Sequence, residues 1–292
     1  FVTCGAGMGV DSGLPDFRGD EGFWKAYPPM SEKGLSFSQC ADPVHFQTDP
    51  EFAWGFYGHR MKLYQETQPG LHFEALLRLF GRAPSGGFVF TSNVDGQFQK
   101  AGFDPLRIHE CHGSIHYLQD VHGRIGGGGI VGPVDQESLQ LKIDPETFRA
   151  ELPLPTVRGP PDGGGDAVLA RPNILMFNDC HWLSERTNAQ RKAMNEWLGR
   201  LSRDGPPGGG RGVRPDAKVV VIDIGSGTAV PTARIMGAKV AGAFDSTLIR
   251  INPRESSVDV GYGSVGPGKG IAFAEGALTV LADIEKQLEA GA

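Results

Sequence analysis

The chain begins with Phe1-Val2-Thr3-Cys4-Gly5-Ala6-Gly7, a segment typical of the first strand and turn of an α/β fold. An apolar, β-branched start predicts a buried strand, and the glycines directly after it predict a tight turn. Such glycines let the backbone approach a pyrophosphate, and a helix that starts there points its positive end at the phosphates. An ordinary strand-to-helix turn has the same pattern, so this fragment by itself leaves both interpretations open.

Beyond this turn, short apolar runs alternate with amphipathic segments. We predict strands at 88–91, 173–177, 218–222 and 247–251, and helices at 51–65, 71–80, 185–201 and 273–288. The strands are short and almost continuously apolar, which is typical of parallel strands covered on both faces. The alternation predicts an α/β fold with a doubly wound, Rossmann-like parallel sheet, in which ligands bind at the carboxyl ends of the strands.

Two stretches are too long for ordinary connections and are rich in Pro together with aromatic residues or Gly: 20–50 and 115–171. We expect these insertions to pack together as a smaller lobe. The large Rossmann-like domain would then comprise approximately residues 1–19, 51–114 and 172–292, and residues 1–292 would form a single unit.

Composition limits the range of partners. The net charge of −6 argues against a nucleic-acid or anionic-membrane surface, since there is no basic excess to replace phosphate counterions. No apolar stretch is long enough to cross a bilayer, and no signal peptide is recognisable, although a start without Met suggests a trimmed chain. The four cysteines form no C-x-x-C pair, so we expect reduced thiols, no metal site and a cytoplasmic location.

A charged loop follows the glycine turn: Gly13-Leu14-Pro15-Asp16-Phe17-Arg18. A charged pair that flanks an aromatic residue can place the Arg on a phosphate or ribose and the Phe over a ring. A salt-bridged surface loop is the alternative.

Asn93 and Asp95 follow the predicted strand at 88–91. Because alternate residues of an extended chain share a face, both polar side chains are expected on one side of the strand end. An amide and a carboxylate there can hold a carboxamide and sugar hydroxyls. An Asx-turn that closes the strand is an equally good explanation.

Three histidines occur close together, at positions 109, 112 and 116. Metal ligation lacks a clear second group of ligands, so one histidine acting as a general base near a sugar hydroxyl is the simpler interpretation. A structural role for each of them is the alternative. Two further strand ends, at Gly225-Ser226 and at Asn252, have the small and polar residues expected for the far half of a dinucleotide site.

Taken in order, these segments resemble the sirtuin family, the NAD-dependent protein lysine deacylases. The resemblance covers nearly the whole chain. It is carried by Gly5-Ala6-Gly7, Gly13 to Arg18, Thr91-Ser92-Asn93-Val94-Asp95, His112-Gly113-Ser114, Arg171 to Phe177, Gly225-Ser226 and Ile251-Asn252.

The resemblance implies a role for each of these residues. Gly5, Ala6 and Gly7 would cradle the pyrophosphate of NAD, while Asp16, Phe17 and Arg18 would shape the loop around the nicotinamide ribose. Asn93 and Asp95 would hold the nicotinamide end, with His112 as the general base and Asn93 beside it in catalysis. Gly225, Ser226 and Asn252 would bind the adenosine half, and Leu175, Phe177 and Asn178 would face the acyl-lysine substrate.

The implied activity is NAD-dependent removal of acyl groups from protein lysine, giving nicotinamide and O-acyl-ADP-ribose. The same site also suits two alternatives, an NAD glycohydrolase and a mono-ADP-ribosyltransferase. A catalytically silent NAD-binding module is a further alternative, against which the retained His112 argues, since a pure binder needs no base.

The chain departs from the family pattern at several positions, and two of these departures bear on the zinc and on the peptide groove. Sirtuins carry two C-x-x-C pairs that bind a structural zinc after the His-Gly-Ser segment. The first pair falls here on Asp120 and Gly123, and no cysteine lies between Cys111 and Cys180, so we expect no zinc. The Phe-Gly-Glu that lines the peptide groove is replaced by Phe177-Asn178-Asp179, which indicates a remodelled substrate side.

Overall fold

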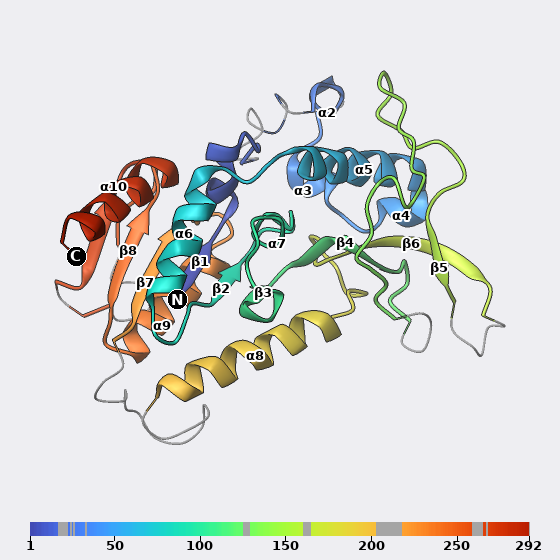
Figure 1. The fold of residues 1–292 in the computed structure, drawn as a ribbon. Helices are drawn as coiled ribbons and strands as arrows, with labels where there is room; N and C mark the ends of the chain where they lie inside the picture. The colour runs from blue at the N-terminus through green and yellow to red at the C-terminus, as the bar shows by residue number, and fades with distance from the viewer. Residues whose placement is uncertain are drawn as a thin grey trace.

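The computed structural model describes residues 1–16, 23, 25, 27–32, 34–124, 129–159, 165–202, 218–258, 265–266 and 268–291. A parallel sheet with the strand order β3-β2-β1-β7-β8-β9 forms one side of the molecule (Figure 1). Its strands are β1 (Val2–Cys4), β2 (Val89–Thr91), β3 (Ile108–Glu110), β7 (Val220–Ile224), β8 (Thr247–Ile251) and β9 (Gly270–Phe273). The predicted doubly wound parallel sheet is therefore confirmed.

Helices cover both faces of this sheet. On one face α6 (Leu71–Arg82) packs beside α10 (Ala277–Ala290), and on the other lie α8 (Glu185–Leu201) and α9 (Thr232–Ala243). The strand β2 shows why both faces are apolar. Val89 belongs to the cluster with α6 and α10, whereas Phe88 and Phe90 belong to the cluster with α8 and α9.

A second, antiparallel sheet has the order β4-β6-β5 (Figure 1). Its strands are β4 (Gly113–Asp120), β5 (Thr156–Arg158) and β6 (Ala167–Ile174). The remaining elements are the 3-10 helices η1 (Ala6–Ser12) and η2 (Pro105–Arg107), and the helices α2 (Pro28–Glu32), α3 (Phe37–Cys40), α4 (His45–Thr48), α5 (Pro50–Glu66) and α7 (Gln97–Lys100).

One hydrophobic cluster joins residues of both predicted insertions, among them Tyr27 and Leu141, to α5 and to the antiparallel sheet. Trp54 on α5 is fully buried in this cluster, and its indole nitrogen donates to the Ala170 carbonyl oxygen of β6 at 2.9 Å. Residues 51–66 therefore pack with the insertions, although we expected them in the large domain. The division into domains stays a prediction.

Two segments differ from the sequence-based prediction. The run 173–177, predicted as a parallel strand of the main sheet, contributes only its first two residues to β6, which is antiparallel. Phe273, predicted to start the last helix, ends β9 instead, and the helix begins at Ala277 after Gly276. Among the described helices, none is long and apolar enough to cross a membrane.

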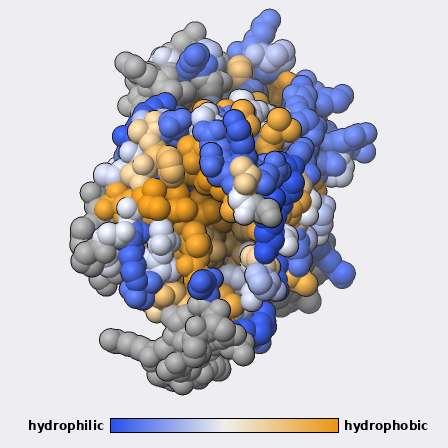
Figure 2. Space-filling model, turned by 60° about the vertical axis from the view of Figure 1, so that its left-hand side comes forward, coloured by the Kyte–Doolittle hydropathy of each residue, from blue (hydrophilic) through white to orange (hydrophobic). Residues whose placement is uncertain are grey.

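The face turned forward in Figure 2 is not uniformly polar. Hydrophobic residues gather in a hollow near its middle, and hydrophilic residues surround them (Figure 2). Apolar surface that is recessed and rimmed by polar residues is typical of binding sites.

Candidate active site at the switch point of the sheet

The strand order reverses between β1 and β7, and the loops after these two strands meet there. The Gly5 amide donates to the Ile224 carbonyl oxygen at 3.0 Å, and the Gly7 amide donates to that of Gly225 at 3.1 Å. A Cβ on Gly7 would lie 2.6 Å from the Gly225 Cα, so side chains are excluded from this contact. The two glycine loops form one backbone surface at the point where doubly wound sheets bind their ligands.

The turn is followed by η1, a 3-10 helix of seven residues, rather than by a long α-helix. The Met8 amide donates to the Gly5 carbonyl oxygen at 3.0 Å. The Gly5 and Gly7 amides already donate to carbonyl oxygens of the protein, so they are not available to a phosphate. The loop suits a pyrophosphate mainly because glycine has no side chain and lets a ligand come close to the backbone.

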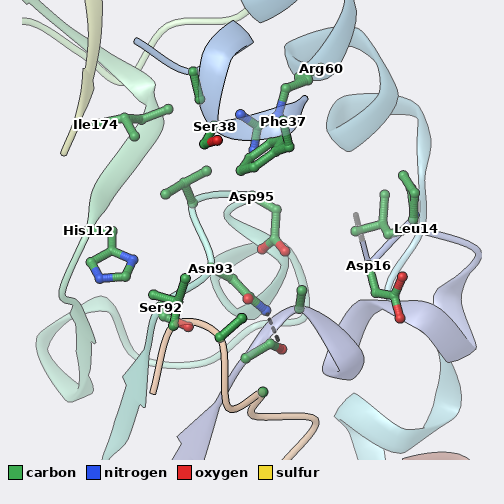
Figure 3. Close-up of a pocket in the computed structure, with 18 of the residues that line it drawn as sticks. Leu14, Asp16, Phe37, Ser38, Arg60, Ser92, Asn93, Asp95, His112 and Ile174 are labelled. Atoms are coloured by element: carbon green, nitrogen blue, oxygen red, sulfur yellow. Dashed lines mark hydrogen bonds between the residues drawn. The ribbon is translucent and has the colours of Figure 1, made fainter. Parts of the chain in front are cut away.

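A cavity of about 760 Å³ opens at this edge of the sheet. Figure 3 shows Asn93 and Asp95 near its middle, with His112 on one side and Asp16 on the opposite side. Of the residues proposed for the site, the cavity is lined by Gly5, Ala6, Asp16, Asn93, Asp95, His112, Leu175, Phe177 and Gly225. Phe17 and Arg18 lie outside the described residues.

Asn93 and Asp95 are fixed by the turn that follows β2. The Asn93 side-chain amide donates to the Gly5 carbonyl oxygen at 3.0 Å, which ties this turn to the glycine loop (Figure 3). Asp95 Oδ1 accepts the Gln97 amide at 2.9 Å, so the Asx-turn is present and the carboxyl still faces the cavity. Burial raises the pKa of Asp95 to about 6, and the nearby Glu110 adds to this rise, while the bond from Gln97 opposes it.

The three histidines have different surroundings. His109 is buried on β3 against Phe90, and His116 places its ring nitrogens near the carbonyl oxygens of Asp95 and Val134. His112, between β3 and β4, is the one of the three that lines the cavity. Burial lowers the pKa of His112 below its usual 6.5, although a hydrogen bond with the Ser92 backbone partly offsets this. A neutral imidazole at pH 7 can accept a proton.

Ser226 and Asn252 lie behind the cavity wall and do not line it. Both are buried, and the Asn252 amide donates to the Ser226 carbonyl oxygen at 3.0 Å. The Ser226 hydroxyl donates to the Asp223 carboxylate, which Arg250 also binds at 2.8 Å. These hydrogen bonds hold the loops after β7 and β8 in place.

Leu175 and Phe177 form a further edge of the cavity. The Leu175 amide donates to the His112 carbonyl oxygen at 2.9 Å, and the Phe177 amide donates to that of Ala41 at 3.1 Å. These bonds take residues 175–177 out of the sheet, which explains why the predicted strand ends early. Asn178 does not line the cavity; its side chain donates to Asp42 at 2.9 Å.

Several lining residues were missed from the sequence. Arg60 on α5 is buried, donates to the Tyr64 hydroxyl at 3.2 and 2.9 Å, and lies 5.4 Å from the centre of the Phe37 ring (Figure 3). Tyr57 and Tyr64 line the cavity from the same helix. Their spacing of three and four residues around Arg60 places all three on one helix face, and this was the signal available in the sequence.

Glu255 closes the end of the cavity near the β7 loop and was also missed. Its carboxylate accepts the Thr228 amide at 3.3 Å as well as the Thr228 hydroxyl. The Asn252 side chain accepts the Glu255 backbone amide at 3.0 Å, so hydrogen bonds hold both the backbone and the carboxylate of Glu255.

Among the described residues, no group of three or more His, Cys, Asp or Glu side chains could hold a metal ion. At the positions of the first family cysteine pair, Asp120 accepts Arg124 Nε at 2.6 Å, and Gly123 packs against the backbone of His181.

Fold and cavity together define a Rossmann-like α/β protein with a ligand site at the switch point of its sheet. A sequence profile of the Sir2 family matches residues 5–124. An NAD-dependent protein deacetylase of Saccharolobus solfataricus is 37% identical over 115 residues, which are 39% of this chain and 42% of that protein. An NAD-dependent protein deacylase of Aquifex aeolicus is 26% identical over 258 residues, 88% of this chain and 84% of that protein.

The solved structure of a Sir2 homologue in complex with NAD superposes with a TM-score of 0.61 at 20% identity and covers 99% of this chain and 89% of that one. At this identity the likeness shows the fold. Residues 5–124 are thus similar to the Sir2 family, and the chain aligns with less than half of the length of the Saccharolobus relative.

Proposed function

We propose that this protein removes acyl groups from protein lysine at the expense of NAD. The observation that carries the proposal is one cavity that joins the Gly5–Gly225 backbone surface, the Asn93–Asp95 turn, the neutral His112 and the Leu175–Phe177 edge. A deacylase site must hold both a dinucleotide and a lysine side chain. The Gly5–Gly225 surface is available to the dinucleotide and the Leu175–Phe177 edge to the lysine. The names of the relatives support this activity.

The described residues fit NAD. The loops at Gly7 and Gly225 pack backbone to backbone, and the main chain of Gly5, Ala6 and Gly225 is left at the cavity, where a pyrophosphate can approach it. Asp95 accepts hydrogen bonds, as an amide NH₂ group requires, and Asn93 is held beside it. NAD supplies the glycosidic bond whose cleavage makes the transfer of the acyl group favourable.

The protein contributes position and proton transfer. Asn93 and Asp95 orient the nicotinamide end, and the Leu175–Phe177 edge holds the acyl-lysine against it. A ring nitrogen of His112 takes the proton from a ribose hydroxyl. NAD, the acyl-lysine and a water molecule are consumed, and the products are nicotinamide, free lysine and O-acyl-ADP-ribose. Correct positioning of two reactants accounts for a large part of such rate enhancements.

Consumption of NAD with and without an acetyl-lysine peptide tests the proposal. We expect NAD loss that depends on the peptide. Equal loss without peptide would favour NAD glycohydrolysis, and label transferred from NAD to a protein side chain would favour mono-ADP-ribosyl transfer. His112, Asn93 and Asp95 are compatible with all three activities. The activities are distinguished by the group that accepts the ADP-ribose.

The acid limb of the pH profile follows from two groups. Asp95 loses its charge as the pH falls through about 6, and His112 becomes protonated below 6.5. The activity needs an ionised Asp95 and a neutral His112, so both groups become inactive at acid pH. We expect kcat/KM for NAD to be flat from about pH 7 to 8 and to fall below about pH 6 with a slope approaching two. In Asp95→Asn the slope should approach one; an unchanged slope would contradict the assignment of Asp95.

We propose further that the antiparallel sheet is held without zinc. The cluster around Trp54 and the hydrogen bonds of Asp120 supply packing where the family has its first cysteine pair. Elemental analysis of the purified protein should give well below one zinc per chain, and a chelator should leave the melting temperature unchanged. One equivalent of zinc would refute this proposal.

We also propose a cytoplasmic location. The four cysteines are free thiols, and Cys180 is exposed, which suits a reducing compartment. Cell fractionation tests this, and recovery in an oxidising compartment would contradict it.

A further inference from the structure

The loop between β6 and α8 carries the substrate-facing edge of the cavity. Its first residues, Leu175 and Phe177, are 38% and 40% exposed, so they remain open to a ligand while their backbone amides are already bound. Polar side chains of the antiparallel sheet hold the rest of this loop in place.

A buried ion pair holds its middle. Arg171 on β6 and Asp179 in the loop both have fully buried side chains and form two parallel hydrogen bonds of 2.7 and 2.9 Å. The carboxylate also accepts the Met176 amide at 3.3 Å and the His181 amide at 3.0 Å. Asp179 therefore binds the loop backbone on both sides of its own position.

Two buried side-chain amides hold the end of the loop that leads into α8. Gln119 on β4 donates to the His181 carbonyl oxygen at 2.7 Å and accepts the Leu183 amide at 3.0 Å. Asn173 on β6 donates to the Leu183 carbonyl oxygen at 2.8 Å. The loop is thus attached to the antiparallel sheet at several points by polar side chains.

Stability alone does not explain the ion pair. Removing two charges from water is costly, and apolar residues of similar volume are often equally stabilising or better. What the bidentate pair adds is a fixed geometry, because a planar guanidinium that donates two parallel hydrogen bonds to one carboxylate sets the orientation of the two groups.

We propose that Arg171 and Asp179 are positioning residues that set the Leu175–Phe177 edge for the acyl-lysine substrate. They do not touch the cavity themselves; they act through the Met176 amide, whose neighbours on both sides line it. This inference rests on the proposed deacylase function.

The double variant R171Q/D179N tests the inference, because it removes both charges together and leaves no unpaired ion in the interior. We expect KM for the acyl peptide to rise about tenfold or more, as misplaced substrate-binding groups cause. KM for NAD should stay within about twofold, since the hydrogen bonds of the pair go to the loop after β6 and not to the loops at Gly5 and Gly225. Equal changes in both KM values, or none in either, would overturn the inference.

The matched control is Asp49→Asn. Asp49 also forms a bidentate pair, with Arg149 at 2.6 and 2.9 Å, but this pair lies at the start of α5. Asn caps a helix as well as Asp does, so we expect both KM values to remain unchanged.

Hydrogen exchange separates this inference from the deacylase proposal. In R171Q/D179N the amides of Met176 and His181 should exchange faster, while those of β8 keep their wild-type rates. Unchanged exchange would overturn the positioning role even if the wild type were inactive. A wild type that ignores acyl peptides would refute the proposed function instead.

Discussion

The variant His112→Ala is expected to lose NAD turnover by about 10²- to 10⁴-fold, the range that a general base contributes. His112 lines the cavity in a form that burial keeps neutral, so it can take a proton at pH 7. The variant should still bind NAD, because the glycine loops and the Asn93–Asp95 turn are untouched. Rates of nicotinamide release, together with NAD affinity from calorimetry, measure the two effects separately.

The matched control is His122→Ala. His122 is an exposed histidine of the turn after β4 and does not line the cavity. We expect wild-type turnover from it. Normal turnover in His112→Ala would show that another group is the base, and a loss of NAD affinity equal to the loss of rate would assign His112 to binding.

The variant Gly225→Ala is expected to have the largest effect on the structure. Gly225 has a φ of +63°, and an added Cβ would lie 2.4 Å from the Gly7 carbonyl carbon. The left-handed conformation and the overlap together should lower the free energy of unfolding by about 2–5 kcal/mol. NAD binding should be lost, because the two glycine loops must move apart.

Gly86→Ala separates these two causes. Gly86 has a φ of +65°, but a Cβ there would meet nothing within 4 Å. We expect it to cost only the conformational term, about 1–2 kcal/mol, and to keep NAD affinity. Urea denaturation and calorimetry measure both variants. Similar losses in the two would mean that the contact between the glycine loops is not needed for the site.

The sequence predicted best those elements whose pattern is local. The strand 247–251 and the helix 185–201 were predicted at their observed bounds. A continuous β-branched run is typical of a strand, and a long amphipathic period is typical of a helix. The helix 232–243 was missed; it is rich in Ala and Gly and has a weak apolar period.

Elements that depend on remote partners could not be predicted. The run 173–177 is apolar enough for a central parallel strand, but its partners lie in β4 and at Ala41. Nothing in its own residues reveals that. The same holds for residues 51–66, whose burial against the insertions follows from tertiary packing.

Among the site residues, too, those set by local sequence were predicted and those that depend on remote contacts were not. Loops at strand ends, such as those with Asn93 and Gly225, were found because the topology of a doubly wound sheet brings strand ends together. Arg60 and Glu255 reach the cavity from a helix and from a loop whose direction the sequence did not reveal. Ser226 and Asn252 were placed at the correct strand ends, but the structure turns them away from the cavity and into the network that supports it.

The stoichiometry of a single reaction distinguishes deacylation from NAD hydrolysis. Purified protein is mixed with NAD and an acetyl-lysine peptide, and the products are counted by mass spectrometry. The deacylase account predicts equal amounts of nicotinamide, deacetylated peptide and O-acetyl-ADP-ribose. Nicotinamide with free ADP-ribose and an unchanged peptide would contradict it and assign the cavity to NAD hydrolysis.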